Sequence, residues 1–308
     1  MWALLLAAFV AAPRCCTAQS AAKAPPVAFT QGVITTHVSL PGNPYDKLLS
    51  RLDPAKGNLQ AQMQQVAAGL TPAEQQQFQA AAAKLPPALA MGALMMPRNG
   101  TIYCKGPEAR AVTDALTYHL ENYFNSATRQ GLLLLASLAS PEKVNYTYDA
   151  AAMKKAWQRI IVTDVDYTVQ RTAETALVAG YPSQKTTYTL KPGAARAAPA
   201  GPGQLPDKPV ALDVWTSSQI PQLLNFAHPV YVPQADGITK LVVYFDPARK
   251  YQLVYEFARV QPRAVTAQEL AIKTIPPVLD YAKDELQVGM KSMGVMLGGS
   301  PEQPAGDK

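Results

Sequence analysis

Residues 116–124 read LTYHLENYF, and apolar side chains recur there at every second position. Tyr118, Leu120 and Phe124 fall on one parity, whereas His119 and its polar neighbours fall on the other. Successive side chains of an extended strand point to opposite faces, so this alternation is typical of a strand with one buried face and one solvated face. The stretch therefore predicts a half-buried β-strand.

The same alternation recurs along most of the chain. It appears at 34–40, 144–148, 165–169, 186–190 and 251–257. Two further stretches, 131–137 and 240–245, are continuously apolar, which indicates strands covered on both faces. Turn signals such as Gly106-Pro107 and Gly180-Tyr181-Pro182 separate these stretches and favour antiparallel hairpins. We therefore expect a mainly β fold with α insertions: a curved antiparallel sheet, or half-barrel, with helices packed on its concave face.

A helical insert is expected at about 46–96. Leu59, Met63 and Val66 recur at helical spacing, and Thr71-Pro72-Ala73-Glu74 is a capping box with proline at the first helical position. The second helix is predicted to run through Lys84 and to end before Pro86-Pro87. The Met91–Met96 cluster that follows could plug a cavity or pack outside it.

Outside this insert, a further helix is predicted near the C-terminus. Its apolar residues form one stripe, consisting of Val278, Leu279, Ala282, Leu286, Met290, Met293 and Leu297. Asp280, Lys283 and Lys291 lie off this stripe. An amphipathic helix buries its apolar stripe, so we expect these residues to cover an apolar surface of the sheet.

The N-terminus resembles a secretory signal peptide. Residues 3–12 are almost purely Ala, Leu, Phe and Val, and small residues near Ala18 suit cleavage there. We expect a signal peptide at 1–18 and a periplasmic or secreted protein. Lipid anchoring fits less well, because Ala12-Pro13-Arg14 before Cys15 departs from the lipidation pattern. Removing 1–18 would leave Cys104 as the remaining cysteine, without a disulfide framework.

The remainder of the chain is expected to form one domain at 29–297, preceded by a flexible segment at 19–28. The stretch 192–209 is rich in Pro, Ala and Gly and predicts a loop, and 298–308 predicts a disordered tail.

Composition excludes several classes of protein. Among 308 residues, 48% are hydrophobic, which suffices for a packed core and excludes a fully disordered chain. The net charge of +6 is scattered rather than clustered, so nucleic-acid binding is not expected. No apolar run reaches the roughly 18 residues that a membrane-spanning helix needs.

A catalytic set can be assembled from the sequence only by combining Cys104, His119 and Asp114. Nucleophilic catalysis needs a thiol beside its base. However, Cys104 shares parity with the apolar Ile102, whereas His119 falls on the polar parity of its own stretch. The alternation therefore predicts a buried Cys104 and an outward His119, and we expect no catalytic residues.

Metal and cofactor sites are likewise not expected. His37, His119 and His228 are far apart and form no pair at ligand spacing. Asp164 and Asp166 could form a carboxylate pair on one strand face, but a solvated polar face explains them as well. The phosphate-binding glycine motifs and the nucleophile elbow do not occur in the sequence.

Aromatic and methionine side chains carry the functional hypothesis. The aromatics on the apolar parity of their strands include Tyr118, Phe124, Tyr146, Tyr188, Tyr255 and Phe257. A plain packed core would explain this parity. The sharper interpretation is a concave ligand-binding face, which these residues line together with Met290 and Met293, because methionine adapts to varied apolar partners.

A family resemblance points the same way. Its motifs are AGYPSQK at 179–185, the strand end RTAET at 171–175, the strand 186–190, VWT at 214–216, and Gly237 before another strand pair. Over Phe29 to Lys283 the chain resembles an uncharacterised exported bacterial domain-of-unknown-function family related to lipoprotein-carrier (LolA-like) half-barrels. Many relatives have a cysteine where this chain has Ser183. The resemblance implies an incomplete barrel around helices, a cavity for lipid or lipoprotein acyl chains, and no known catalytic residues.

Three functions follow as hypotheses. The first is non-catalytic binding of a lipid or acyl chain in the cell envelope, as a carrier or sensor. The second is a structural or interaction module with a filled core that contacts an envelope protein through its polar outer face. The third is a hydrolase of unfamiliar type that uses Cys104, His119 or Asp114. We expect no cofactor, and the oligomeric state and the ligand's identity stay open.

Overall fold

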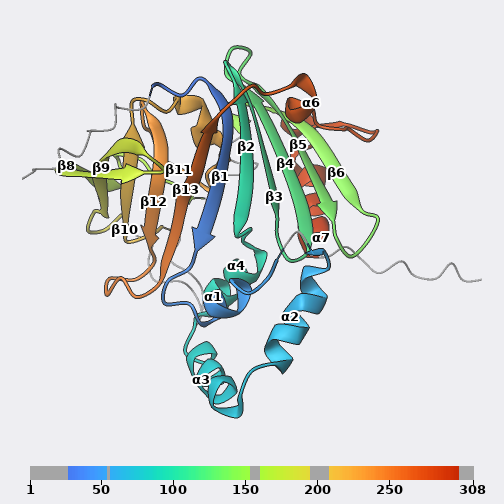
Figure 1. Cartoon of the computed structure of the whole chain (residues 1–308), viewed down its shortest axis with the longest axis vertical. Helices are drawn as coiled ribbons and strands as arrows, with labels where there is room; N and C mark the ends of the chain where they lie inside the picture. The colour runs from blue at the N-terminus through green and yellow to red at the C-terminus, as the bar shows by residue number, and fades with distance from the viewer. Residues whose placement is uncertain (1–26, 54–55, 153–159, 195–207, 298–308) are drawn as a thin grey trace, which may run out of the picture.

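One open sheet of twelve strands dominates the described residues, which are 27–53, 56–152, 160–194 and 208–297 of this computed structural model. The strand order is β14-β6-β5-β4-β3-β2-β1-β13-β12-β10-β9-β8 (Figure 1). The bounds are β1 Gln31–Ser39, β2 Asn99–Lys105, β3 Glu108–Asp114, β4 Tyr118–Asn125, β5 Gln130–Ser137, β6 Lys143–Asp149, β8 Tyr167–Val178, β9 Tyr181–Leu190, β10 Ala211–Ser217, β12 Gly237–Tyr244, β13 Gln252–Pro262 and β14 Leu279–Asp280. Pairing is antiparallel except between β14 and β6. The predicted mainly β fold with helices is confirmed.

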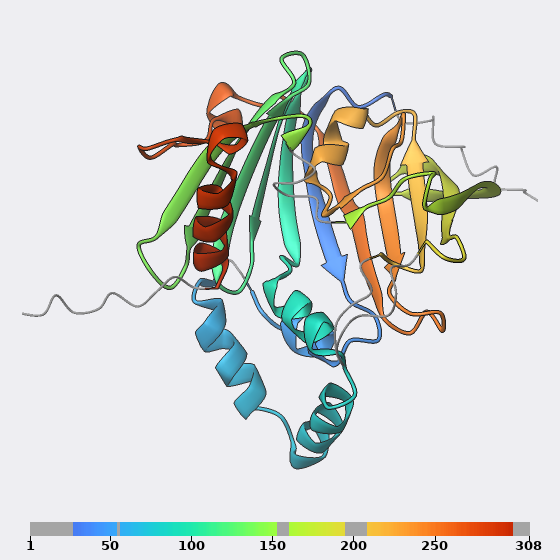
Figure 2. The same ribbon diagram turned by 180° about the vertical axis from the view of Figure 1, so that it is seen from behind.

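The two faces of the sheet carry different elements. α7 (Tyr281–Met296) packs against β5 and β6, and η2 (Gln222–Ala227) packs against β3, β4 and β12. Figure 2 shows both in front of the sheet, together with the small parallel pair of β7 (Ile160–Ile161) and β11 (Val230–Tyr231). We call this the inner face. α6 (Ala267–Leu270) packs on the opposite, outer face against β2 and β3.

The predicted alternation is confirmed along β4. Tyr118, Leu120 and Phe124 are buried and belong to the main hydrophobic core on the inner face. The two continuously apolar strands are also covered on both faces, as expected. In β5, for example, Leu133, Leu134 and Leu135 are all buried although neighbours point in opposite directions.

The prediction for 165–169 is only partly correct. Tyr167 is buried, but Val165 lies in a turn and is exposed, and Val169 is exposed as well. β8 is the last strand of the sheet and pairs only with β9, so most of its side chains have no covering layer. The expected strand position of Asp164 and Asp166 is also wrong, because both lie in this turn.

The insert between β1 and β2 forms four helices. They are α1 (Pro44–Leu49), α2 (Leu59–Ala68), α3 (Pro72–Ala82) and α4 (Pro87–Met95). The capping box is confirmed, because Thr71 and Glu74 exchange side-chain and backbone hydrogen bonds at the start of α3. α2 and α3 extend beyond the end of the sheet rather than over its face (Figure 1). Beyond Pro86 a further helix begins at Pro87, because the first helical position needs no N–H donor.

The predicted stripe of the C-terminal helix is wrong as a buried face. Leu286 is 75% exposed, Met290 63% and Met293 46%. α7 instead contacts the sheet through residues spaced by seven, of which Tyr281 and Val288 are buried. The predicted stripe lies on the solvent side of the helix, because residues two positions from Val288 point away from the sheet.

Some expectations fall outside the described residues. They are the signal peptide at 1–18, nearly all of the flexible segment at 19–28, most of the loop at 192–209 and the tail at 298–308. Within the described ranges, every helix is too short or too polar to cross a bilayer.

Candidate functional site

A cavity of about 320 Å³ lies on the inner face, beneath α4. Parts of the chain that are far apart in the sequence enclose it: the segment between β1 and α1, α4, β4, β7, the start of β11, the turn from β12 into β13, and the end of α7. The side chains that close it include Leu89, Ala93, Met95, Tyr118, Leu253 and Met296. Its volume is about twice that of an apolar cavity of about 150 Å³ that stays dry and binds benzene. The space therefore suits an apolar group larger than a single ring.

Three polar side chains at this cavity already make hydrogen bonds within the protein. Asn43 donates its amide N–H to the carbonyl oxygen of Leu89 over 3.2 Å and accepts from the backbone N–H of Tyr45 over 3.0 Å. Tyr118 donates its hydroxyl to the carbonyl oxygen of Met95 over 2.8 Å. Gln252 donates to the carbonyl oxygen of Arg249 over 2.9 Å. A ligand in this cavity therefore meets mainly apolar groups, which favours an apolar ligand.

α4 is held over the cavity by these same bonds. The last carbonyl groups of a helix lack intrahelical partners, and Tyr118 satisfies that of Met95. Asn43, the residue that caps α1, fixes α4 from its other end through Leu89. At Gly92 an added Cβ would meet no atom within 4 Å, although this glycine lines the cavity and is exposed. Gly92 therefore lies at the mouth.

The sequence-predicted ligand-lining residues lie in five different places. Tyr118 lines the cavity beneath α4, and Phe124 lines a second cavity at the other end of β4. Tyr255 borders a small space of about 40 Å³. Tyr146, Tyr188 and Phe257 are buried in the main core and line none of these spaces. Met290 and Met293 point to solvent on α7.

The methionines that do line the cavity come from two other places. Met95 and Met96 at the end of α4 reach it, as does Met296 at the end of α7, whereas Met91 is exposed. The Met91–Met96 cluster thus lies partly at the cavity and partly outside it. The signal in the sequence is weak but present: α4 is apolar all round, which indicates a buried helix rather than one that covers a single face.

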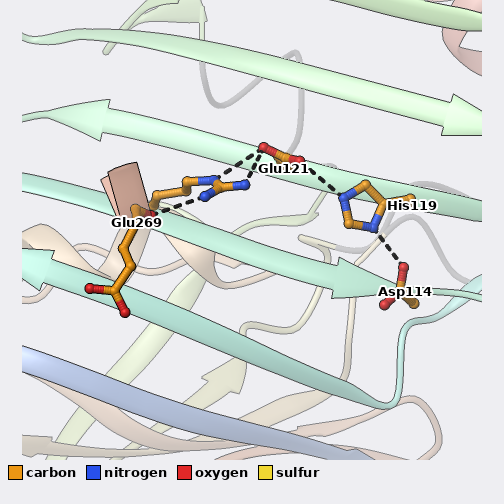
Figure 3. A network of polar contacts seen from close by, with 5 residues as sticks. Asp114, His119, Glu121 and Glu269 are labelled. Carbon is orange, nitrogen blue, oxygen red and sulfur yellow. Dashed lines mark hydrogen bonds and ion pairs between the residues drawn. The ribbon is translucent and has the colours of Figure 1, made fainter. Parts of the chain in front are cut away.

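A polar network occupies the outer face of β3 and β4 (Figure 3). His119 lies between two carboxylates, with Nδ1 2.6 Å from Asp114 Oδ1 and Nε2 3.2 Å from Glu121 Oε1. Arg110 donates to Glu121 Oε2 over 2.6 Å and to the backbone carbonyl oxygen of Glu269 in α6 over 3.0 Å. The hydrogen bonds to Asp114 and Glu121 raise the pKa of His119 to about 9. Burial raises the pKa of Glu121, but its bonds to His119 and Arg110 outweigh this, so the net shift is downward.

Cys104 lies on the other side of the sheet. Its side chain is fully buried in the inner-face core, as the parity argument predicts, and burial raises its pKa to about 11. Asp114 and His119 are in contact, but the sheet itself separates them from the thiol. The structure therefore does not assemble a Cys-His-Asp set. Within the ranges described above, no three His, Cys, Asp or Glu side chains are arranged to hold a metal ion.

Comparison with known proteins supplies no family. No family model matches the chain, and no curated protein matches it. Among solved structures, PNGF-II in space group C2 aligns with a TM-score of 0.38 and 13% identity, over 64% of this chain and 30% of that one. The P21 form aligns at 0.36 and 12%, over 63% and 30%. This chain thus spans about a third of the length of those structures.

A domain from Vibrio parahaemolyticus, assigned provisionally as an outer membrane lipoprotein-sorting protein domain, aligns with a TM-score of 0.14 and 6% identity, over 56% of this chain and 83% of that one. With TM-scores this low, none of these alignments supports a function.

Proposed function

We propose that this protein binds an apolar ligand, an acyl chain or a similar lipid, in the cavity beneath α4, as a carrier or sensor in the cell envelope and without catalysing a reaction. One observation carries the proposal: a space of about 320 Å³ whose wall is mostly apolar and whose Asn43, Tyr118 and Gln252 side chains are already hydrogen-bonded. The location in the envelope rests on the signal peptide expected at 1–18.

The test is a titration of the purified protein with a fluorescent fatty acid. We expect saturable binding of one ligand per chain. At Gly92 an added Cβ meets no atom within 4 Å, so Gly92→Phe places a ring at the mouth of the cavity, and we expect about tenfold weaker binding or more. Met91→Phe is the matched control, because Met91 lies next to Gly92 on α4 but points to solvent. No saturable uptake by the wild type, or equal loss in both variants, would refute the proposal.

A second candidate function is that of a protein-interaction module. The exposed apolar side chains of α7 favour it, because Leu286, Met290 and Met293 stand in solvent on one side of the helix. That hypothesis also predicted a filled core, which the cavity beneath α4 does not match. If Met290→Gln with Met293→Gln abolished binding of a defined envelope protein while fatty-acid binding stayed absent from the wild type, this second function would replace the first.

A further inference from the structure

A second cavity, of about 480 Å³, opens at the far end of the inner face. It lies where β4 turns into β5, and η2 and the residues after β11 close it from the other side. Phe124 borders this cavity, and Tyr118, six residues earlier on the same strand, borders the first; at about 3.3 Å per residue the two are about 20 Å apart. Leu120 between them and Leu224 of η2 are fully packed, so the two cavities are separate.

Two aromatic rings form a wall of this second cavity. Phe124 and Phe226 stack with centroids 6.0 Å apart and an angle of 23° between their planes. Tyr148 continues the stack behind Phe124, with centroids 6.3 Å apart and planes 8° apart. Phe124 is 8% exposed and Phe226 2%, so only a small part of either ring is open to the cavity. An edge-to-face contact with a further aromatic ring is favourable, so this part of the wall suits a ligand with a flat apolar body.

A positively charged side chain, that of Arg129, lies at the rim of this cavity. Arg129 lines the cavity, and its backbone is left-handed, with φ of +59°, a conformation that favours glycine. Among the described residues no carboxylate pairs with its guanidinium. The carboxylate of nearby Asp149 instead accepts from the backbone N–H groups of Ala151 and Ala152, over 2.9 and 2.7 Å. Positive φ alone does not distinguish Arg129, since Ala179 and Arg249 have it too; what distinguishes Arg129 is its place in the lining of this cavity.

The amides at this cavity do not compete for that role. Gln222 donates to the carbonyl oxygen of Gln234 over 2.6 Å, and Gln234 donates to the hydroxyl of Tyr188 over 2.6 Å. Among the described lining residues, Arg129 is the one that carries a positive charge, and its guanidinium also offers hydrogen-bond donors. Guanidinium binds carboxylate through paired, charge-assisted hydrogen bonds.

We propose that this second cavity is a binding site for a small organic anion with a flat apolar body. The ring of the ligand packs against Phe124 and Phe226, and its carboxylate is held by Arg129. This site is independent of the acyl-chain cavity, and it stands whether or not that cavity binds lipid.

The test compares 1-naphthoate with its neutral amide, 1-naphthamide, by calorimetric titration of the full chain. We expect the wild type to bind the carboxylate about tenfold more tightly than the amide. In Arg129→Gly the turn is retained, because glycine adopts positive φ without strain, and the preference for the carboxylate should disappear. Arg249→Gly is the matched control: Arg249 also has positive φ, 54°, and is exposed, but it lies in the turn between β12 and β13 over Tyr244.

Each result of this titration either supports the proposed anion site or overturns it. A preference lost in Arg129→Gly and kept in Arg249→Gly supports the site. The same preference in wild type and Arg129→Gly, an equal loss in both arginine variants, or no measurable binding of naphthoate overturns it. Gly92→Phe separates the two cavities: it should leave naphthoate binding unchanged, and a loss there would assign the ligand to the cavity beneath α4.

Discussion

Tyr118 on the central strand β4 donates its hydroxyl to the carbonyl oxygen of Met95, the last residue of α4, over 2.8 Å. This bond crosses the edge of the cavity and joins two elements that are separate in the sequence. It satisfies a terminal carbonyl group of α4 and orients Tyr118 along the cavity wall. The same bond therefore contributes to the stability of the fold and to the shape of the candidate site.

Tyr118→Phe removes this hydroxyl and leaves the Met95 carbonyl without it. A typical intramolecular hydrogen bond contributes about 1 kcal/mol, so we expect the free energy of unfolding to fall by about that amount. Urea denaturation measures it. The control is Tyr45→Phe, since Tyr45 packs edge to face on Phe78 and its hydroxyl makes no hydrogen bond within the described part of the chain. Equal effects of both substitutions would show that the Met95 bond contributes nothing.

The His119 network predicts a pH dependence of stability. The pKa of His119 is raised to about 9 from an ordinary 6.5. The contribution of His119 to the free energy of unfolding is therefore fully present below pH 6.5 and is lost as pH rises through 9. The shift sets an upper limit of about 3 kcal/mol, which solvent contact reduces to about 1–2 kcal/mol. Measured unfolding free energies should fall by this amount between pH 6.5 and 9 in the wild type, and His119→Gln should abolish the fall. A parallel pH profile in the variant would contradict the assignment.

Cys104 should behave as a core residue rather than a nucleophile. Its pKa of about 11 leaves little thiolate at neutral pH, and its side chain has no solvent contact. In a chain carrying Cys15→Ser and Cys16→Ser, we expect an aromatic disulfide reagent to label Cys104 only after unfolding. Cys104→Ala should cost about 1 kcal/mol of stability. Rapid labelling of the folded protein would instead revive the hydrolase hypothesis.

The orientation of α7 can be tested by truncating opposite sides of the helix. Val288 is 1% exposed, so Val288→Ala removes buried methyl groups and should lower the free energy of unfolding by about 1–3 kcal/mol. Met290→Ala, on the solvent side, should change it by less than about 0.5 kcal/mol. The reverse order would show that the helix lies on the sheet with the face that its sequence stripe predicts.

Much of the sheet could be predicted because one face of nearly every strand is buried. The parity that places Tyr118 and Phe124 inward and His119 outward follows from strand geometry alone. The same reasoning failed at Val169, since most of the edge strand β8 has no covering layer although Tyr167 at its start is buried. On α7 the apolar stripe was real, but periodicity does not reveal which side of a helix meets the sheet, and the side with Val288 does.

The candidate site was predictable only in part. Tyr118, which was chosen because it shares the apolar parity of its strand, lines the cavity beneath α4; whether it contacts a ligand stays a prediction. Leu89, Ala93 and Met296 were not identified, because the cavity exists only where the ends of α4 and α7 meet the sheet. The local sequence of α4 and α7 does not indicate that their ends come together at the sheet. Arg129 was not identified either, because the cavity that it lines forms only where the turn after β4 meets η2 and the residues after β11.

Methionine methyl NMR tests the central claim most directly. Met95, Met96 and Met296 line the cavity beneath α4, whereas Met290 and Met293 stand in solvent on α7. When palmitate is added to protein labelled with ¹³C at its methionine methyl groups, the resonances of the three cavity methionines should shift and saturate at one ligand per chain. Saturating shifts at Met290 and Met293 alone, or no shift at any of the five, would contradict an acyl-chain site in this cavity.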